Sequence, residues 1–444
     1  MQVKKNSKKI KEENLNKIER NKLNTNIHGI TLVALVVTII VLIILAGVSI
    51  NLVLGNNGII TKAKQAKENM EIAANEEQES LANIEITINN MGASNPSTEI
   101  KTVAELKETG TYMTEKTTLK DSNGNLIKVP KGFKIAEDSG INVTEGIVIE
   151  DNDIVSGIGN NRGNQYVWIP VGTGIKKSET ETVDITLGRY DFADGENDIS
   201  EDGVTPLDKG TPILIQNIND YTNQTDDIKI DANEGRTYCY EDITQRPGKA
   251  SSGTDGLNAT ALSILNFKTS VENNGGYYIA RYEASYGTDR KANSKVSNSA
   301  GTTTPTTEGT VWNCITQLDA ATASRGLYTT ATTDLINSYA WDTAIVYIQE
   351  FSVDTDYSYQ NGDSINASFT NTGVNGDEVC KINDMASNIL EWTTEYSIFT
   401  YDSYAGPCTM RGGSCMEGTY TSFRNIDFAT DAPAEVTFRL TLYM

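Results

Sequence analysis

Three oxygen-bearing side chains stand close together near the C-terminal end of the chain. Asp384, Asn388 and Glu391 lie within a span of eight residues. Carboxylate and amide oxygens are the ligands that Ca²⁺ prefers in proteins. The spacing therefore predicts a calcium site at these three residues. The alternative is that they cap turns and hydrogen-bond the backbone, as Asp and Asn commonly do.

Tyrosine and arginine recur in the segment that follows, among serine, threonine, aspartate and asparagine. Tyr and Arg supply rigid contact area and the small polar residues supply adaptable hydrogen bonds, a mixture typical of binding surfaces. We predict a ligand-binding surface made by Tyr396, Tyr401, Tyr404, Arg411, Tyr420 and Arg424. The alternative is a solvated loop surface that has no specific ligand.

The single histidine, His28, restricts the chemistry of the chain. If an N-terminal leader is removed, the mature protein has no imidazole, which excludes Ser-His-Asp and Cys-His catalysis and His-ligated zinc. Five cysteines occur without a CxxC spacing, so we expect mostly buried thiols, with a Cys408–Cys415 disulfide left open.

The chain is acidic, with 37 Lys and Arg against 59 Asp and Glu and a net charge of −22. Residues 1–29 are the exception, because they carry eight basic and three acidic residues. An acidic body has no basic stripe that could displace counterions from phosphates, so we expect no nucleic-acid partner.

A long apolar segment, residues 30–54, follows the basic N-terminus and contains no charged residue. As a helix it would be about 37 Å long, enough to span a bilayer. Basic residues favour the cytoplasmic side of a membrane. We therefore expect a single-pass protein of the cell membrane, with its N-terminus in the cytoplasm and its acidic body outside.

The junction Gly29-Ile30-Thr31-Leu32 resembles the prepilin signal of type IV pilins and type II secretion pseudopilins. The resemblance implies that a prepilin peptidase cleaves after Gly29, that Ile30 is methylated, and that other pilin-like subunits are partners. Ala34 stands where pilins usually carry the glutamate used in assembly. The alternatives are a plain membrane anchor and a cleaved secretory signal, although the apolar run is too long for the latter.

The remaining sequence suggests further segments. Residues 55–91 show apolar residues at three- and four-residue steps and predict an extended amphipathic helix, and residues 92–102 a hinge. A small β-rich region is expected over 103–164 and a larger domain over 165–444. Within these we expect strands at 146–149, 165–170 and 438–444 and a helix at 337–351.

Four segments of the larger domain resemble, in order, the formylglycine-generating enzyme and sulfatase-modifying-factor family. They are Gly276–Glu283 (GYYIARYE), Tyr339–Ala344 (YAWDTA), Asn383–Thr393 (NDMASNILEWT) and Arg411–Ser414 (RGGS) with Phe438-Arg439. The resemblance implies a loop-rich C-type-lectin-like domain and calcium near residues 384–391. With the membrane helix, the expected fold class is α+β.

The same family's oxidase holds copper between two cysteines, and Glu417 and Ser422 stand at the matching positions here. Copper(I) requires soft thiolates, which a carboxylate and a hydroxyl do not replace. We therefore expect neither copper nor enzymatic activity. A displaced copper site at Cys408 and Cys415, and with it a copper-dependent formylglycine-type oxidase, is the alternative.

Together these features predict a bacterial surface protein whose pilin-like N-terminus displays a non-catalytic head that binds an extracellular ligand. One alternative is a structural minor pilin or pseudopilin that acts in type IV pilus or type II secretion assembly. Another is a variable binding protein diversified by a retroelement, which the fold resemblance and the Tyr-rich C-terminal segment both permit.

The Gly29–Ile30 junction leads to the first testable prediction. N-terminal sequencing of protein extracted from bacterial membranes should begin at Ile30 and should find a methylated amine. A sequence that begins at Met1 would leave only a plain anchor, and one that begins near Gly47 would indicate a secretory signal.

Overall fold

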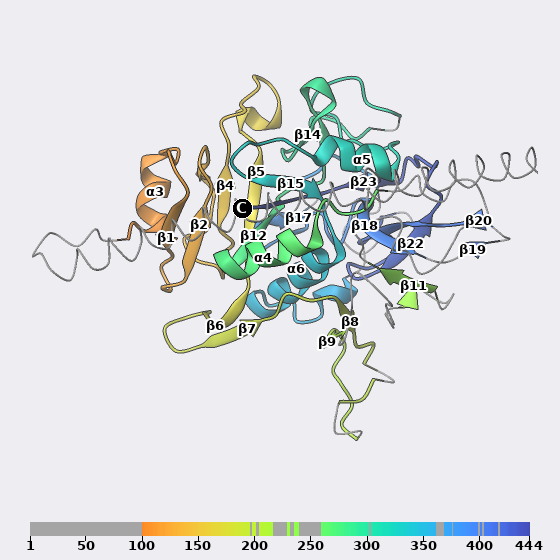
Figure 1. The fold of residues 1–444 in the computed structure, drawn as a ribbon, viewed down its shortest axis with the longest axis horizontal. Coiled ribbons are helices and arrows are strands. Elements are labelled where there is room, and N and C mark those ends of the chain that lie inside the picture. Colours follow the sequence, from red (N-terminus) through yellow and green to blue (C-terminus); the bar gives the residue numbers. More distant parts are fainter. Residues whose placement is uncertain are drawn as a thin grey trace, which may run out of the picture. The chain divides into compact units, whose positions relative to one another are not determined.

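Two six-stranded β-sheets are the largest elements of the fold (Figure 1). The computed structural model describes residues 100–444 except 196–197, 201–203, 216–228, 231–234, 239–258, 302, 361–367, 375, 398–399, 402–403 and 416–417. At 229–230, 235–238, 400–401 and 404–405 it describes the backbone alone. The strand labels follow the order along the chain.

The first sheet has the strand order β15-β24-β12-β5-β4-β3, and all its neighbours are antiparallel. Its strands are β3 (Lys134–Ile135), β4 (Val148–Glu150), β5 (Gln165–Pro170), β12 (Gly276–Ala280), β15 (Thr332–Leu335) and β24 (Leu440–Tyr443). The strands predicted at 146–149 and 165–170 are confirmed as β4 and β5. Every residue of β5 and β12 is buried, which explains why these strands read as continuous apolar runs.

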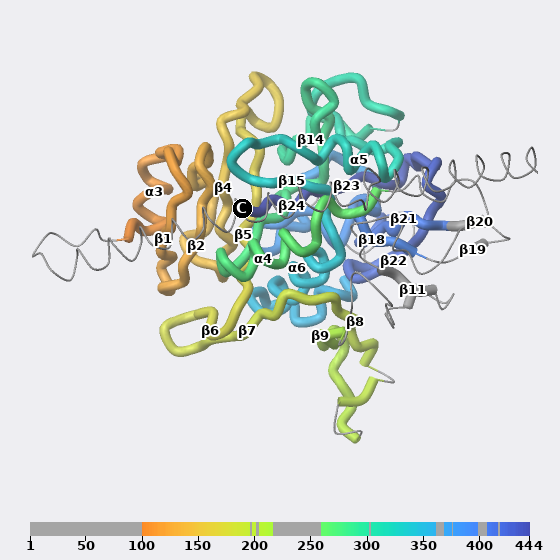
Figure 2. The backbone as a smooth tube through the Cα atoms, viewed as in Figure 1, coloured from red at the N-terminus to blue at the C-terminus, as the bar shows by residue number. Residues whose placement is uncertain are grey.

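The second sheet has the order β10-β11-β18-β21-β22, and β23 pairs with β18 in parallel. Its strands are β10 (Lys229–Ile230), β11 (Gly235–Tyr238), β18 (Leu390–Ser397), β21 (Cys408–Arg411), β22 (Arg424–Asp427) and β23 (Val436–Phe438). The C-terminal strands β18, β21 and β22 lie side by side in the blue part of the chain (Figure 2). The strand predicted at 438–444 is interrupted at Arg439, which separates β23 from β24.

Shorter elements surround the sheets. Six antiparallel two-stranded sheets are described. Three of them are β1 (Thr117–Lys120) with β2 (Leu126–Val129), β6 (Gly172–Lys176) with β7 (Thr182–Ile185), and β8 (Tyr190–Phe192) with β9 (Pro212–Leu214). The other three are β13 (Ser285–Tyr286) with β14 (Ala292–Asn293), β16 (Glu378–Val379) with β17 (Ile382–Asn383), and β19 (Thr400–Tyr401) with β20 (Tyr404–Ala405). The described helices are α3 (Val103–Thr109), α4 (Ile264–Asn274), α5 (Gln317–Ser324) and α6 (Ser338–Phe351), with 3₁₀ turns η1 (Gly159–Asn161), η4 (Thr288–Arg290) and η5 (Tyr357–Tyr359).

Helix α6 links the two sheets. It contacts β5 of the first sheet and β18 of the second, and all but one of its residues are buried. Asn337 caps its N-terminus by accepting a hydrogen bond from the Ala340 amide at 3.0 Å. This confirms the helix predicted at 337–351. Because α6 is surrounded by protein, its polar side chains must find partners inside the fold.

Large aromatic side chains fill the core, as the sequence predicted for the tryptophans. Trp168, Trp341 and Trp392 are fully buried. The ring of Trp168 meets that of Tyr278 edge-on, with 4.9 Å between centroids. The indole N–H groups of Trp341 and Trp392 donate to the carbonyls of Thr421 and Ile315. These bonds tie the tryptophans to loops far away in the sequence.

The expected α+β class is wrong for the described part of the chain, which is mostly strand and contains four α-helices. Its apolar segments are short and end at turn residues, and even the longest strand, β18, has only eight residues. The regular elements described in residues 165–444 are therefore twenty strands, most of them short, and three α-helices, in place of the expected α+β domain.

The membrane helix expected at residues 30–54 and the amphipathic helix expected at 55–91 lie outside the described residues. Among the helices that the structure does describe, none has the length and apolar character needed to cross a bilayer. Residues 99–444 form one compact unit. The domain boundary expected at residue 165 falls between β4 and β5, which are hydrogen-bonded neighbours in one sheet.

A close backbone approach explains the Gly412-Gly413 pair. Gly412 has a φ of +101°, and a Cβ atom on Gly413 would lie 1.9 Å from the Ala386 carbonyl oxygen. The Gly413 amide in turn donates to the Met385 carbonyl at 3.1 Å. The sequence suggested that these glycines allow positive φ or close approach, and both are confirmed.

Replacing Gly413 with alanine should therefore destabilise the protein severely. Backbone atoms cannot move aside as a flexible side chain can, so we expect Gly413→Ala to lower the free energy of unfolding by about 3 kcal/mol or more. Gly326→Ala is the control for backbone strain without a clash, because Gly326 has a positive φ, which Gly413 does not, and has open space around it. That variant should lose only about 1 kcal/mol. Equal losses in urea denaturation would contradict the steric explanation.

Candidate functional site

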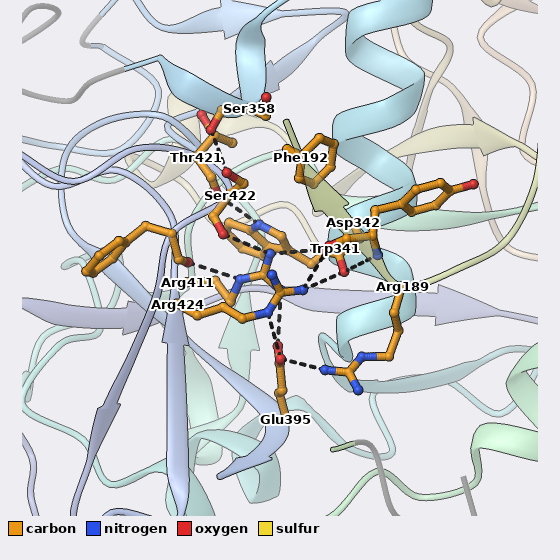
Figure 3. Close-up of polar contacts among 12 residues, drawn as sticks. Arg189, Phe192, Trp341, Asp342, Ser358, Glu395, Arg411, Thr421, Ser422 and Arg424 are labelled. Carbon is orange, nitrogen blue, oxygen red and sulfur yellow. Dashed lines mark hydrogen bonds and ion pairs between the residues drawn. The ribbon is translucent and has the colours of Figure 1, made fainter. Parts of the chain in front are cut away.

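Five charged side chains meet in the interior between α6 and the second sheet (Figure 3). The two carboxylates are Asp342 on α6 and Glu395 on β18, and the three guanidinium groups belong to Arg189, Arg411 and Arg424. All five are at most 5% exposed. We call these residues the arginine–carboxylate network.

The two carboxylates bridge the arginines of neighbouring strands. Arg411 and Arg424 are directly opposite each other in the β21–β22 pair. Arg411 donates to Asp342 Oδ1 at 2.6 Å and to Glu395 Oε2 at 3.0 Å. Arg424 donates to the other oxygens, Asp342 Oδ2 at 2.7 Å and Glu395 Oε1 at 2.8 Å. Each carboxylate therefore accepts from both arginines.

Backbone carbonyls and a third arginine complete the network. Arg189 donates to Glu395 Oε1 at 2.8 Å, and Arg411 also donates to the Phe423 carbonyl at 3.1 Å. Burial disfavours a charged guanidinium, but Asp342 and Glu395 outweigh this and raise the pKa of Arg424. Arg424 therefore remains charged. Removing one partner from such a buried group typically costs about 3–5 kcal/mol.

The glycine pair next to Arg411 also helps to place the network. The loop that contains Gly412 and Gly413 passes so near Ala386 that no side chain fits on Gly413. Arg411 precedes this loop, so the approach that requires glycine also sets where the Arg411 strand ends. A glycine pair and a buried arginine that are adjacent in sequence thus act together. Packing and charge pairing explain the RGGS segment without catalysis.

A small pocket of about 50 Å³ lies against this network. Its walls are largely aromatic, and Arg424 and Ser422 contribute polar groups. The rings of Tyr359 and Tyr420 stack with 4.9 Å between centroids, and Phe423 meets Tyr420 edge-on at 5.5 Å. We call this the aromatic pocket; its lining residues are Asp191, Phe192, Tyr359, Tyr420, Ser422, Phe423 and Arg424.

The polar groups of the aromatic pocket are held in place. The Ser422 hydroxyl donates to the Ser358 carbonyl at 2.8 Å, and the Tyr359 hydroxyl donates to the Phe192 carbonyl at 2.7 Å. The Ser422 amide also donates to Ser358, at 2.9 Å. A hydroxyl that already donates to a carbonyl lacks the neighbouring base that would activate a nucleophile. The arrangement favours binding over chemistry.

The structure brings together three of the six residues predicted to bind a ligand. Tyr420 and Arg424 line the aromatic pocket, and Arg411 lies beneath it in the network. Tyr396 is 2% exposed within β18. Tyr401 and Tyr404 pair with each other in the β19–β20 hairpin, whose side chains lie outside the described ones.

Sequence reasoning missed Asp342, Glu395, Tyr359 and Asp191 as parts of this site. Asp342 stood in the YAWDTA segment and Glu395 four residues beyond the predicted calcium ligand Glu391, but neither has a local pattern that indicates a buried partner. The structure pairs Arg189 and Glu395 across 206 residues of sequence. Only the folded arrangement shows such a pair.

The positions expected to hold copper do not show a thiolate pair. Ser422 is engaged with Ser358, and Glu417 lies outside the described residues. Cys408 and Cys415 are thiols and do not form the disulfide that was left open. Cys408 Sγ lies 3.7 Å from Gln317 Oε1, inside the core. The donor set found here does not fit copper(I).

A second buried cluster contains the predicted calcium ligands. The Glu391 carboxylate accepts hydrogen bonds from Nε and Nη2 of Arg439, and the shortest of them joins Nη2 to Oε1 at 2.6 Å. Asp384 Oδ2 accepts from the Thr372 hydroxyl at 2.7 Å and from the Gly373 amide at 2.6 Å. Asn388 donates to Glu283 Oε2 at 2.5 Å. The oxygens predicted to hold calcium thus already bind protein groups.

Burial raises the pKa of carboxyl groups beside the predicted calcium ligands. Among the described residues, no group of three or more His, Cys, Asp or Glu side chains is arranged to hold a metal ion. Burial, together with Asp384 and Glu391, instead raises the pKa of Glu283 well above its usual value. Burial and Asp384 also raise the pKa of Asp377 to about 6. Calcium at Asp384, Asn388 and Glu391 remains an untested prediction from the sequence.

The chain was compared with protein-family models, with curated proteins and with solved structures. None of them matches it. The resemblances to prepilins and to the formylglycine-generating family therefore remain expectations from the motifs, and the functional argument depends on the geometry of the pockets.

The protonated Glu283 leads to a prediction about pH. Unfolded Glu283 loses its proton near pH 4.5, whereas the folded protein retains it. The stability that this proton gives is complete below pH 4.5 and is lost as the pH rises through the raised folded pKa. In Glu283→Gln the side chain stays neutral. The difference in free energy of unfolding between Glu283→Gln and wild type should therefore shift in favour of the variant by at least about 1 kcal/mol as the pH rises from 5 to 8.

Glu272→Gln is the matched control, because Glu272 is an exposed residue of α4 and should show no such gain. Chemical denaturation at each pH measures the difference. A second set of curves with calcium or with a chelator tests the calcium prediction, and from the contacts we expect the two sets to coincide. If Glu283→Gln gains nothing between pH 5 and pH 8, Glu283 is charged in the folded protein.

Proposed function

We propose that residues 99–444 are a non-catalytic recognition head and that the aromatic pocket binds one side chain of a protein ligand. The observation that carries this proposal is the pairing of aromatic walls with a neutralised, immobile polar floor. Buried aromatic and arginine side chains in well-packed pockets contribute most of the binding energy at protein interfaces. A pocket of about 50 Å³ matches the tip of one side chain.

The rigidity of the pocket supports the proposal. Tyr420 is held between Tyr359 and Phe423, and hydrogen bonds to Glu395, Asp342 and the Tyr190 carbonyl fix Arg424. A preformed site loses little conformational entropy when a ligand binds. The surrounding segments are rich in small polar residues, which suits the rim of an interface.

The charge distribution favours recognition over catalysis. A nucleophile or general base needs a group whose proton can move, but Asp342 is shared between two arginines and Glu395 among three. The hydrogen bonds that Arg424 makes within the described part of the chain use Nε and Nη2, which leaves Nη1. That nitrogen can donate to a carbonyl or carboxylate of the ligand.

A peptide library displayed on phage and selected on the full-length protein tests this proposal. Enriched peptides should share one anchor side chain and should bind Tyr420→Ala at least tenfold more weakly, because the variant removes a wall of the pocket. Tyr112→Ala is the matched control, since Tyr112 is also half-buried but lies outside the pocket lining. Near-ultraviolet circular dichroism confirms folding of both variants. Peptides that bind wild type and Tyr420→Ala equally would overturn the proposal.

The oxidase alternative is tested with the same protein. With copper, oxygen and a Cys-x-Pro-x-Arg peptide, the peptide should keep its cysteine, because the described residues hold no thiolate pair in the matching positions. Conversion of that thiol to an aldehyde, lost in Cys415→Ser, would show that the protein is an enzyme with a displaced site at Cys408 and Cys415.

A further inference from the structure

A larger pocket lies elsewhere in the described structure, beside the start of β5. It has a volume of about 270 Å³ and is lined mainly by Glu137, Asp138, Asn160, Arg162, Tyr282 and Lys295. We call it the polar pocket. No residue of the aromatic pocket contributes to it. The function proposed above does not use it.

Ion pairs fix the charged groups of the polar pocket. Arg162 donates to the buried Glu150 through Nε at 2.8 Å and to Asp138 through Nη2 at 3.3 Å. Asp138 also accepts from Arg281 at 2.6 Å. Lys295, whose side chain is fully buried, donates to the Asp153 carbonyl at 2.5 Å and to its carboxylate at 3.0 Å. Each cation is therefore paired with an acid.

Several polar atoms of this pocket retain hydrogen-bonding capacity. Arg162 Nη1 is only within 3.9 Å of Glu137, which is too long for a hydrogen bond. The Tyr282 hydroxyl has no hydrogen-bond partner among the described residues, although Tyr282 is only 7% exposed. Glu137, whose side chain is 89% exposed, offers acceptor oxygens at the rim.

The backbone near Lys295 is shaped to keep the pocket open. Gly159 has a φ of +54°, and a Cβ atom there would lie 2.7 Å from Lys295 Cβ. The next residues, Asn160 and Asn161, also have positive φ, at 56° and 59°. This left-handed turn passes close to the lysine stem because residue 159 has no side chain. Both Gly159 and Lys295 belong to the lining of the pocket.

The arrangement of hydrogen-bond donors and acceptors in the polar pocket indicates which class of ligand it suits. An anion requires surplus positive charge, but each cation here already has its acid. A zwitterion requires donors and acceptors in separate groups, but Arg162 lies within 4 Å of both Asp138 and Glu137. A hydroxyl group can both donate and accept a hydrogen bond. A ligand that carries several hydroxyls therefore suits a pocket in which donors and acceptors alternate. The volume is below the usual range for drug-sized ligands.

We propose that the polar pocket binds a neutral sugar of monosaccharide size. Its hydroxyls accept from Arg162 and Tyr282 and donate to Glu137 and Asp138. The ligand is either a free hexose or the terminal unit of a glycan, because both present the same hydroxyls. This binding is independent of the aromatic pocket.

Calorimetric titration of the full-length protein with D-glucose, D-galactose and D-mannose tests the proposal. At least one of these neutral hexoses should bind, and its uronate and its 2-amino derivative should bind at least fivefold more weakly, because each brings an unpaired charge. Tighter binding of the uronate would make the pocket an anion site and overturn the proposal. Failure of all three hexoses to bind would overturn it as well. Binding of a methyl glycoside as tight as that of the free sugar would identify a glycan terminus as the source.

Tyr282→Phe is the decisive variant, because it removes only a hydroxyl that has no described partner. It should leave the melting temperature unchanged and weaken hexose binding about tenfold. Glu137→Gln, at an exposed rim position, should weaken it by a smaller factor. Tyr420→Ala, in the other pocket, should leave hexose binding unchanged. Equal hexose affinity of wild type and Tyr282→Phe would show that the sugar binds elsewhere.

Discussion

The buried arginine–carboxylate network is the interaction on which the rest of the recognition site depends. Charges taken out of water are stable only where their hydrogen-bonding capacity is met by well-placed partners, and here Asp342 serves two arginines and Glu395 serves three. Asp342 comes from α6, Glu395 from β18, Arg411 from β21 and Arg424 from β22. The network therefore fixes the helix against three strands. It also sets the position of the aromatic pocket, because Arg424 is part of both.

Local features of the chain were predictable where a short segment decides its own structure. Helix α6 begins at Asn337, whose side chain caps it, and β5 is a continuous apolar run that ends at Pro170. The helix and this strand were therefore predicted correctly from residue types alone. The α+β class was not, because the many two- to eight-residue strands of this fold have too little periodicity to be recognised one by one.

The binding site was only partly predictable, for a different reason. Tyr420 and Arg424 were identified from their residue types, but the same reasoning placed Tyr396 on the surface. Tyr396 lies in Leu390–Ser397, a strand whose polar composition suggests exposure and whose residues are all buried. Its Thr and Glu side chains are satisfied inside the protein, since Glu395 meets arginines and the Thr393 hydroxyl donates to the Thr409 carbonyl at 3.2 Å. A polar sequence indicates exposure only when no buried partner exists.

The two pockets differ in how they treat charge, and this difference separates their ligands. In the aromatic pocket the rings of Tyr359, Tyr420 and Phe423 stand beside the polar groups of Asp191 and Arg424, so a bound side chain would combine ring contact with a hydrogen bond to Arg424. In the polar pocket the ion pairs themselves form the lining, and Tyr282 and Arg162 keep donors that the described residues do not use. Paired charges of this kind offer directional hydrogen bonds without a net field. Under these two proposals one head would recognise a protein side chain at one site and a neutral sugar at the other, because the two sites share no lining residue.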